Sequence, residues 1–418
     1  MGSSSGPIVI IGGGAVGLCS AFYLNESGAE VIVVDRNAEA EASSMHNAGY
    51  VCPSHFIPLA SPGIIAQGLK WMLNPSSPFY VRPRPNRSFL AWALRFYRSC
   101  TPAHVEASVE LLRDLGNASL ALYEEFSRVE GMRFGFTRRG LLILYRTEAG
   151  KKGCEEEANE AGQIGVEARM LGADAVRDLE PGVDMRVPGG LYFPGDAHLI
   201  PADFMGSLRS LLERKGIRFL KAEATGFRTN GGAITSVLAG QETLRAGQVV
   251  LAAGSWSPVV AAMLGIRLLV EAGKGYSITI PEPPVLPSVP FILSEARVAV
   301  TPMGSTLRFA GTMELAGRSL TITNRRVEAI KQAVPSYVGG FEAGAFSQAR
   351  VWAGLRPVSP DGLPYVGRSS AYGNLVVATG HAMIGMSLAP ITGKLVAGIA
   401  SGTALPFNIS GLHPDRFA

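Results

Sequence analysis

The sequence predicts an α/β fold in which a doubly wound parallel sheet is combined with a second part built on an antiparallel sheet. Near the start, the buried β-branched run Ile8–Ile11 enters a glycine-rich turn and a helical stretch, and a second buried run, Val31–Val34, follows. A further buried strand that ends in small residues appears far downstream, at 248–254. Three later runs are typical of strands in a second, antiparallel sheet: 274–280, 298–301 and 306–312.

The first turn has the pattern of a dinucleotide-binding β-α-β unit. Three glycines stand at the spacing G-x-G-x-x-G: Gly12, Gly14 and Gly17. The first permits the tight turn, the second lets a pyrophosphate approach the backbone, and the third lets the helix pack against the sheet. Free N–H groups near Ala15 and Val16 would hold the phosphates, and Asp35 would bind an adenosine ribose. A lone G-x-G-x-x-G is often an ordinary turn, but both strands and the acid are in place, so dinucleotide binding is predicted.

Length and composition exclude several classes of protein. The chain has 418 residues, is 47% hydrophobic and carries a net charge of +4, which suggests two to three domains and gives no reason to expect nucleic-acid binding. The four cysteines are scattered without a C-x-x-C pair, so neither a metal site nor a disulfide framework is expected, and a reducing, cytoplasmic location fits. Two uncharged stretches, Pro7–Asn25 and Asn374–Gly393, fit nucleotide turns better than membrane spans, and no signal peptide is expected.

Two further segments suit a flat, phosphate-bearing ligand. Ser43–Tyr50 is a small-residue loop with an Asn-Ala-Gly turn, and 248–257 is a buried strand that ends in A-A-G-S-W-S. A nicotinamide dehydrogenase that uses one nucleotide-binding unit would leave the second segment unexplained. Two-domain flavoproteins need such a turn, because their chain returns there to the nucleotide domain.

These motifs together resemble a known family. In order, the chain holds G-x-G-x-x-G, S-S-x-x-N-A-G, A-A-G-S-W-S, G-L-R-P-x-x-x-D-G-x-P and T-G-H-x-x-x-G. This order resembles the FAD-dependent D-amino-acid dehydrogenases, relatives of glycine oxidase and D-amino-acid oxidase, over essentially the whole chain. The stretch H-N-A-G-Y-V-C-P-S-H-F-I-P-L-A-S-P-G is similar to the branch that includes D-proline and hydroxy-D-proline dehydrogenases.

The resemblance implies a division of the chain and a set of cofactor contacts. It implies a discontinuous Rossmann-type FAD-binding domain (7–60, 190–265 and 345–418) and an inserted α+β substrate domain on an antiparallel sheet (61–189 and 266–344). FAD would be bound without a covalent link. Beyond the fingerprint residues, it assigns FAD contacts to the following positions: Arg36, Ser43, Ser44, Asn47, Ala48, Gly49, Ala224, Ala253, Gly254, Gly380, Gly385 and Met386.

The substrate pocket is assigned in the same way. Arg356 matches the arginine that grips the substrate carboxylate, although by its residues alone it could equally form a structural ion pair with Asp361. Val298 and Met383 stand where glycine oxidase has a tyrosine and a second arginine, which predicts a larger, more apolar pocket. Tyr50 and Tyr276 are candidates for its wall, and the alternative is that they belong to a core.

The implied reaction is oxidative deamination of a D-amino acid. Hydride would pass from Cα to flavin N5, the imino acid would hydrolyse to a 2-oxo acid and ammonia, and electrons would pass to a quinone or another carrier. Three alternatives remain open: a cyclic imino acid substrate such as D-proline, oxygen as the acceptor, and a non-catalytic flavoprotein subunit. The apolar segment Phe56–Tyr80 predicts either peripheral membrane contact or packing beneath the substrate domain.

Overall fold

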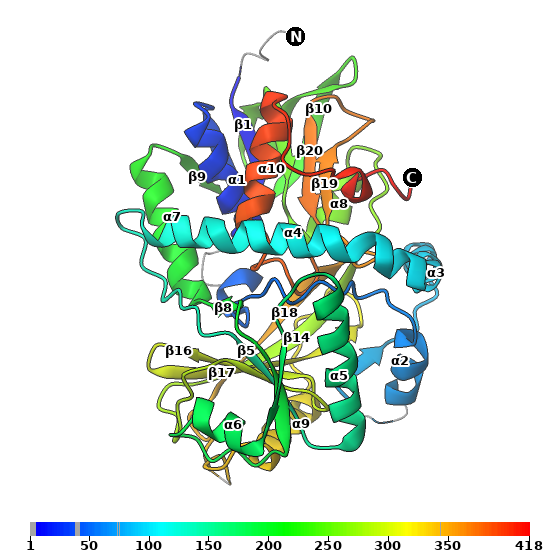
Figure 1. Ribbon diagram of the computed structural model, residues 1–418. Coiled ribbons are helices and arrows are strands. Elements are labelled where there is room, and N and C mark those ends of the chain that lie inside the picture. The colour runs from blue at the N-terminus through cyan, green and yellow to red at the C-terminus, as the bar shows by residue number, and fades with distance from the viewer. Residues whose placement is uncertain (1–5, 38–41, 73, 75, 343) are drawn as a thin grey trace.

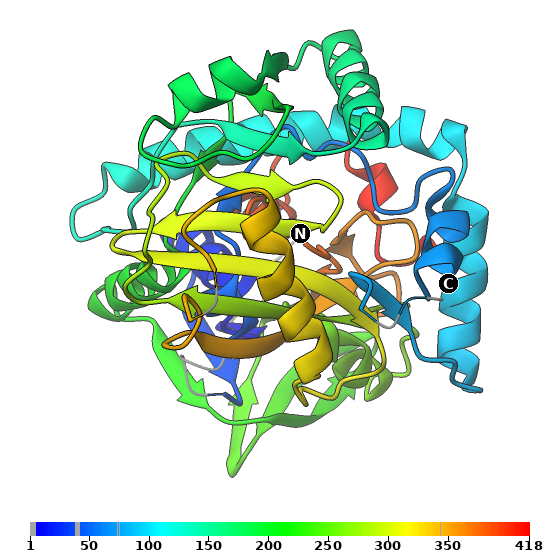
Figure 2. The same ribbon diagram turned by 90° about the horizontal axis from the view of Figure 1, so that it is seen from below.

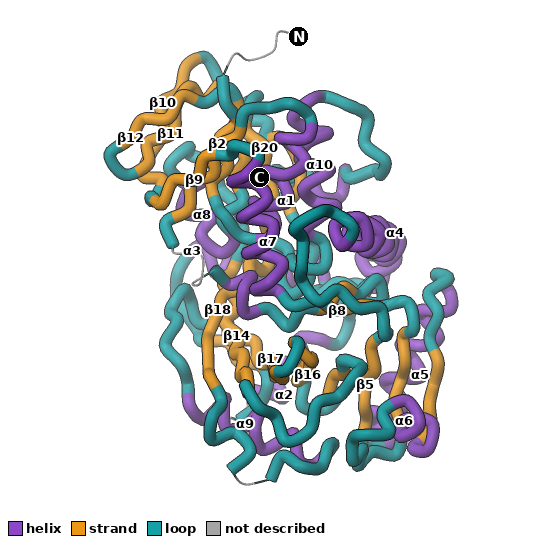
Figure 3. Tube along the Cα trace, turned by 90° about the vertical axis from the view of Figure 1, so that its left-hand side faces the viewer, coloured by secondary structure: helices purple, strands orange, loops and turns teal. Residues whose placement is uncertain are grey.

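The structure is a computed structural model that describes residues 6–37, 42–72, 74, 76–342 and 344–418. Its strands form two large sheets, one at the top and one at the bottom of Figure 1. A two-stranded ribbon, formed by β3 (Tyr50–Val51) and β8 (Ala197–His198), lies between the two sheets. Figure 3 labels β8 at this level from the side.

The first sheet is doubly wound and confirms the predicted fold class. Its strands, in spatial order, are β19 (Tyr365–Arg368), β20 (Leu375–Thr379), β13 (Gln248–Leu251), β1 (Ile8–Ile11), β2 (Val31–Asp35) and β9 (Arg218–Lys221). β1 pairs in parallel with β13 on one side and with β2 on the other, and only β19 runs antiparallel. The carboxyl ends of β1, β2 and β13 therefore meet at one edge, where such sheets bind ligands.

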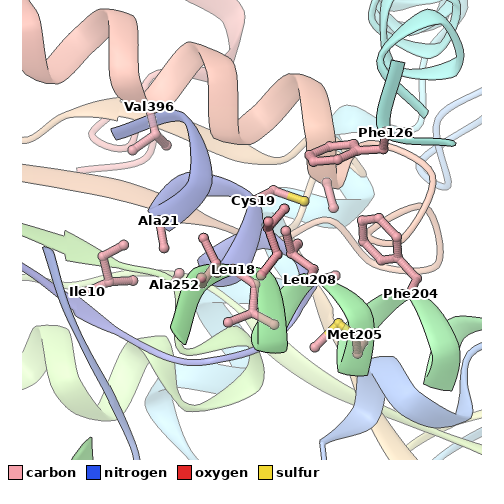
Figure 4. Packing of buried hydrophobic residues seen from close by; sticks show 14 of the residues in the cluster. Ile10, Leu18, Cys19, Ala21, Phe126, Phe204, Met205, Leu208, Ala252 and Val396 are labelled. Carbon is pink, nitrogen blue, oxygen red and sulfur yellow. The ribbon is translucent and has the colours of Figure 1, made fainter. Parts of the chain in front are cut away.

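Both faces of this sheet are covered, which explains why β1 is apolar throughout. Ile10 faces a core formed with α1 (Ala15–Glu26), α7 (Pro201–Arg214) and α10 (Ala389–Ser401), as Figure 4 shows. Val9 and Ile11 face a second core, formed with α8 (Ser257–Ala262) and a three-stranded sheet of β10 (Ala224–Asn230), β11 (Ala233–Ala239) and β12 (Glu242–Arg245). A strand buried on both faces needs no polar side chain.

The second sheet is mainly antiparallel. Its strands, in order, are β18 (Arg350–Val358), β14 (Glu271–Ile280), β17 (Thr306–Leu315), β16 (Val298–Met303), β15 (Phe291–Leu293), β5 (Leu141–Tyr145), β7 (Gly189–Phe193) and β6 (Arg169–Gly172). Two pairings are parallel: β5 with β15, and the short β4 (Phe79–Val81) with β17. The predicted antiparallel sheet is thus present, and the two parallel pairings arise because long connections bring β4 and β5 in from elsewhere in the chain.

Helices cover both faces of the second sheet. α9 (Asn324–Ala333) and α6 (Ala173–Leu179) pack on one face, where Figure 2 shows α9 crossing the strands. α5 (Glu148–Gln163) packs on the opposite face. The long α4 (Pro102–Ser127) crosses between the two sheets and packs against α10, and α3 (Arg87–Ser99) and α2 (Ile64–Met72) lie at one side (Figure 1). Short 3-10 turns complete the fold: η2 (Ser43–His46), η3 (Gly254–Trp256), η4 (Val334–Ser336) and η5 (Ser410–Leu412).

Sheet membership differs from the predicted domain division at two boundaries. β7 begins at Gly189 and β18 at Arg350, so the first-domain segments predicted at 190 and 345 each begin with a strand of the second sheet. α4, which was placed in the substrate domain, packs into the core beneath α1 and α10. The chain thus crosses between the layers later than its motifs indicate, because β18 carries Arg356 and still pairs with β14.

Candidate active site

The turn between β1 and α1 has the geometry that a pyrophosphate requires. Gly12 adopts φ +114°, and a Cβ on Gly17 would lie 1.8 Å from the Gly12 carbonyl oxygen, so neither position accepts a side chain. No side chain caps α1 at Gly14, and the Ala15 N–H donates to Ser44 Oγ at 3.0 Å. The start of α1, with the backbone of Val16 in its first turn, therefore presents a positive dipole end to the edge of the sheet.

Asp35 ends β2 beside this turn, where a ribose is expected. Its Oδ2 accepts from the Gly13 N–H at 2.6 Å and its Oδ1 accepts from the Asn37 N–H at 2.8 Å. Each carboxylate oxygen keeps a further lone pair for a hydroxyl donor. The guanidinium of Arg36 lies 4.2 Å from the ring centroid of Trp256, in the second predicted turn, so the two turns meet at this point.

The second turn and the segment before α10 complete the nucleotide edge. Gly254 adopts φ +53°, and its carbonyl oxygen, next to Ala253, accepts from Thr379 Oγ1 at 3.1 Å. Gly380 adopts φ +81°. Ala224 is buried at the start of β10, Gly385 lies beside His381, and the carbonyl of Met386 accepts from the Tyr123 hydroxyl. α10 begins at Ala389, with Pro390 in its first turn.

The loop Ser43–Gly49 is held against the second sheet by a residue that the sequence did not single out, Arg308. Its Nη1 donates to the Asn47 carbonyl at 2.7 Å and to the Met45 carbonyl at 3.2 Å, and its Nε donates to Thr279 Oγ1 at 3.1 Å. Only 8% of Arg308 is exposed, and burial lowers its pKa to about 10. The one available signal was a charged residue inside the buried run 306–312.

A cavity of about 1040 Å³ opens between this loop and the second sheet. Ser43, Asn47 and Ala48 form part of one wall, and β14, β17 and β18 contribute the opposite wall. The His46 ring stacks on the Trp352 indole with ring centroids 4.2 Å apart. The structure thus brings the predicted loop and the predicted anchor residue, Arg356, into one cavity.

Arg356 is a partly buried cation without an acidic partner among the described residues. Its Nη1 donates to the Thr312 carbonyl at 2.6 Å, and burial alone lowers its pKa to about 10, so it remains charged at neutral pH. The structural alternative, an ion pair with Asp361, is absent because Asp361 pairs with Arg416 at 2.7 Å. A partly buried guanidinium without a carboxylate partner favours an anionic ligand.

The four predicted pocket residues fare differently. Met383 lines the cavity and is 50% exposed. Tyr50 also lines it, but its hydroxyl donates to the Phe291 carbonyl at 2.8 Å. Tyr276 borders the cavity, while its hydroxyl donates to Glu314 at 2.7 Å in a buried cluster with Lys274 and Arg326.

The assignment of Val298 to the pocket wall is wrong. Val298 and Tyr276 both pair with Gly311 and share the face of the sheet that packs on α9. Side chains alternate between the faces of a strand, so the neighbouring Arg297 and Ala299 line the cavity instead.

Burial sets the protonation state of three histidines and of one cysteine. It lowers the pKa of His55 and of His198 to about 4 and that of His381 to about 3, so all three rings are neutral at pH 7. It raises the pKa of the Cys52 thiol well above its usual value, which disfavours the thiolate. Among the described residues, no group of acidic, histidine and cysteine side chains has the arrangement of a metal site.

One buried carboxyl near the cavity was not predicted. Asp196 accepts from the Ser54 N–H at 3.2 Å and from the Ser54 hydroxyl at 2.5 Å, and Ser54 lines the cavity. Burial raises the pKa of Asp196 to about 7. Asp196 and Ser54 lie far apart in sequence, so no local pattern could have paired them.

These features define a flavoprotein oxidoreductase: two nucleotide turns on a doubly wound sheet, facing a substrate sheet across one cavity. Residues 7–399 match the family model described as DAO, FAD dependent oxidoreductase, and the chain belongs to this family. It is 34% identical to a D-amino acid dehydrogenase of Cereibacter sphaeroides, over 98% of this chain and 95% of that protein. It is 32% identical to a D-amino acid dehydrogenase of Bradyrhizobium diazoefficiens, over 98% and 99%.

Solved structures share the fold. Glycine oxidase from Geobacillus kaustophilus superposes with a TM-score of 0.78 at 21% identity, covering 98% of each chain. L-proline dehydrogenase from P. horikoshii superposes with a TM-score of 0.70 at 20% identity, covering 99% of this chain and 97% of the other. The predicted family, fold class and cofactor are therefore confirmed: the chain is an FAD-dependent oxidoreductase.

The residues at the nucleotide edge fit FAD. Gly14 at the start of α1 has no side chain to cap the next N–H groups and leaves the approach open, and Asp35 retains acceptor capacity for a ribose. The loop Ser43–Gly49 would lie along the ring system, at the wall of the cavity that holds Arg356.

Arg308 provides a test of this cofactor site. Arg308→Met keeps the volume but removes both bonds to the loop, so we expect FAD affinity to fall by about tenfold or more, because a hydrogen bond to a charged group is worth roughly 1.5–3 kcal/mol. Arg308→Lys keeps the charge but has a single donor group, so its FAD affinity should lie between that of the wild type and that of Arg308→Met. FAD retained after gel filtration would be measured as flavin released by acid. Arg218→Met removes an exposed pair with Glu242 and is the matched control. Full FAD retention in Arg308→Met would contradict the role of Arg308.

Proposed function

We propose that this enzyme is a D-amino-acid dehydrogenase that holds its substrate carboxylate on Arg356. The observation that carries the proposal is the state of Arg356: a partly buried guanidinium lines the cavity, and it donates to a neutral carbonyl, that of Thr312. The planar fork of arginine pairs with both oxygens of a carboxylate. Curated relatives at 31–34% identity that bear the name D-amino acid dehydrogenase support an amino acid as the source of that carboxylate.

The cavity wall supports a side chain larger than that of glycine. From β14 to β16, the sheet presents small residues beside Arg356: Gly275, Ala310 and Ala299. Met383 and the aromatic residues of α2 and β4 add apolar surface. An amino acid anchored by its carboxylate would lay its side chain on this apolar surface, which excludes water from the reacting carbon.

FAD, when bound, accepts a hydride from the substrate carbon and supplies the redox chemistry. The chain then has to supply orientation, because hydride transfer requires the Cα–H bond to point at the acceptor. A bidentate contact with Arg356 fixes two substrate atoms and leaves one rotation to be set by the apolar walls. The substrate amine must be neutral before hydride leaves. The proposal assigns its proton to water, because burial lowers the pKa of the neighbouring His55 ring to about 4, which makes that ring a weak base. The imino acid would hydrolyse to a 2-oxo acid and ammonia.

The FAD link is proposed to be non-covalent. Cys52 is 3% exposed, and burial raises the pKa of its thiol. Its backbone N–H donates to Ser387 Oγ, so the residue is part of the packing. A thiol held in this state is a poor nucleophile. The acid treatment of the Arg308 series measures this property as well, since covalently held flavin would stay with the pellet.

The role of Arg356 is tested by substitution. Arg356→Lys keeps the charge and loses the fork, whereas Arg356→Ala loses both. A charge-assisted pair in a dry site is worth about 2–5 kcal/mol, so kcat/KM for the Ala variant should fall by roughly a hundredfold or more. FAD content should stay unchanged, and an amine without a carboxylate should react poorly with every variant. Arg350→Ala removes an exposed arginine from the same strand and is the control.

Normal kcat/KM for every amino acid in Arg356→Ala would contradict the proposal, and loss of FAD would show a structural role. A substrate panel that includes D-proline separates an open-chain amino acid from the alternative, a cyclic imino acid.

The electron acceptor is proposed to be a quinone met at a membrane surface. Within the described residues, no helix combines the length and hydropathy of a membrane span. α3, however, exposes an apolar stripe at Leu90 (58%), Leu94 (50%) and Tyr97 (67%), and Leu69 of α2 is 61% exposed. Residues 56–100 contain no acid, and their cations are Lys70, Arg82, Arg84, Arg87, Arg95 and Arg98. Apolar side chains ringed by cations suit an anionic lipid surface.

Vesicle flotation tests this contact. The protein should float with vesicles that contain anionic lipid at low salt, and less so at high salt. The double variant Leu90→Glu with Leu94→Glu should reduce binding at least tenfold, since each buried leucine contributes about 1.5–3 kcal/mol. Leu320→Glu alters an exposed leucine elsewhere and should bind as the wild type does. Absence of wild-type flotation at low salt would remove the membrane proposal.

A further inference from the structure

A β-bulge interrupts β17 opposite the anchor arginine. In the pairing of β14 with β17, Lys274 faces Glu314 and Tyr276 faces Gly311, so Gly275 alone stands opposite two residues, Thr312 and Met313. On its other edge, β17 changes its partner at the same place. It pairs with β16 as far as Gly311 and with β4 from Met313 onward. Bulges of this kind redirect backbone groups and are common beside active sites.

Thr312, the first residue of the bulge, has an unfavourable backbone conformation. Its φ is +69°, a region that glycine usually occupies in such bulges and that a β-branched side chain rarely adopts. The conformation aims the Thr312 carbonyl at Arg356, whose Nη1 donates to it at 2.6 Å. A strained residue that makes a directed contact inside a cavity is a recurring feature of functional sites.

Gly275 supplies the surface on which the guanidinium lies. A Cβ at this position would be 2.0 Å from Arg356 Nη1 and 2.5 Å from Nη2. Its cross-strand partner on β18 is Gly354, where a Cβ would be 2.1 Å from the Trp352 ring. Two bare backbones thus lie side by side beneath the guanidinium and the indole, and at neither position could a side chain be added without moving the group above it.

We propose that Thr312 and Gly275 are positioning residues that fix the plane of the Arg356 guanidinium, one through its carbonyl and the other through its lack of a side chain. One guanidinium nitrogen is thereby committed to the bulge, and the others are free to receive a carboxylate from the cavity. The inference rests on the proposed function of Arg356 and adds the device that orients it. An arginine left free to rotate would lose the bidentate geometry but not the charge.

The test uses the FAD-loaded enzyme and a ligand with no reactive carbon. Butyrate is titrated against the visible spectrum of the bound flavin, with butyramide as its uncharged match. Gly275→Ala should raise the dissociation constant for butyrate at least tenfold and leave that for butyramide unchanged. In turnover, KM for the amino acid should rise by a similar factor. Equal FAD content and an unchanged melting temperature will establish that the variant is folded.

Gly311→Ala is the matched control. It adds the same methyl group to the same sheet, but on the face that packs against Ile330 of α9, where the new Cβ would lie 3.3 Å from that side chain. It should lower the melting temperature without a change in butyrate affinity. If Gly275→Ala and Gly311→Ala have the same effect on butyrate, the proposed positioning is wrong.

Thr312→Gly is the second variant, and it tests the strain. Glycine accepts φ +69° without cost and keeps the carbonyl, so the butyrate constant should stay within about twofold of the wild type while the melting temperature rises. A lower melting temperature would show that Thr312 is not strained and would overturn its part in the proposal.

The outcomes separate this inference from the proposed function. If Arg356→Ala weakens butyrate binding but Gly275→Ala does not, the anchor is correct and the positioning device is wrong. If butyrate binds no more tightly than butyramide to the wild-type enzyme, and Arg356→Ala changes neither affinity, the carboxylate anchor itself is wrong.

Discussion

The site depends on one electrostatic constraint, a partly buried guanidinium in the cavity wall that has no counter-ion within the part of the chain that the structure describes. An unpaired buried charge is costly, and the cost falls when an anion arrives. Arg356 approaches this condition in the wall of the cavity, where its Nη1 donates to the Thr312 carbonyl. Nearby acids are already engaged, since Asp361 pairs with Arg416 and Glu314 pairs with Lys274 and Arg326. The arrangement therefore reserves the cation for a ligand.

The rest of the fold brings the nucleotide edge to that cation. The loop Ser43–Gly49 leaves the first sheet, crosses the gap and is fastened to the second sheet by Arg308. β18 carries Arg356 in the second sheet and then leads directly into β19 of the first. Arg308, which also has no acidic partner among the described residues, thus ties the loop Ser43–Gly49 to the strands that carry Arg356. One face of the second sheet therefore holds both the proposed cofactor loop and the proposed substrate anchor.

The sequence was sufficient for features that are local. The β1–α1–β2 unit, the position of Asp35 beside its turn and the turn at Gly254 are each defined by residues within a short span, where glycine and helix-terminus chemistry leave few alternatives. The role of Arg356 came from resemblance and remains a proposal, but its location in the cavity could be anticipated from the motif order.

The features that the sequence missed are set by register and long-range pairing. Val298 is assigned to the pocket by its match to a glycine oxidase position, and a difference of one residue in that match moves a side chain to the opposite face of the sheet, here to the α9 face. The bulge at Thr312 shifts the register by one residue, which no local pattern announces. Arg308 and Asp196 contact partners far away in the chain.

The most direct test of the central claim is anaerobic mixing of the FAD-loaded enzyme with the two enantiomers of one apolar amino acid, followed at the flavin absorbance. The account predicts rapid bleaching by the D enantiomer, slower bleaching when deuterium replaces hydrogen at Cα, and little reaction with the L enantiomer. Faster reduction by the L enantiomer, or no reduction by any amino acid while FAD remains bound, would contradict it.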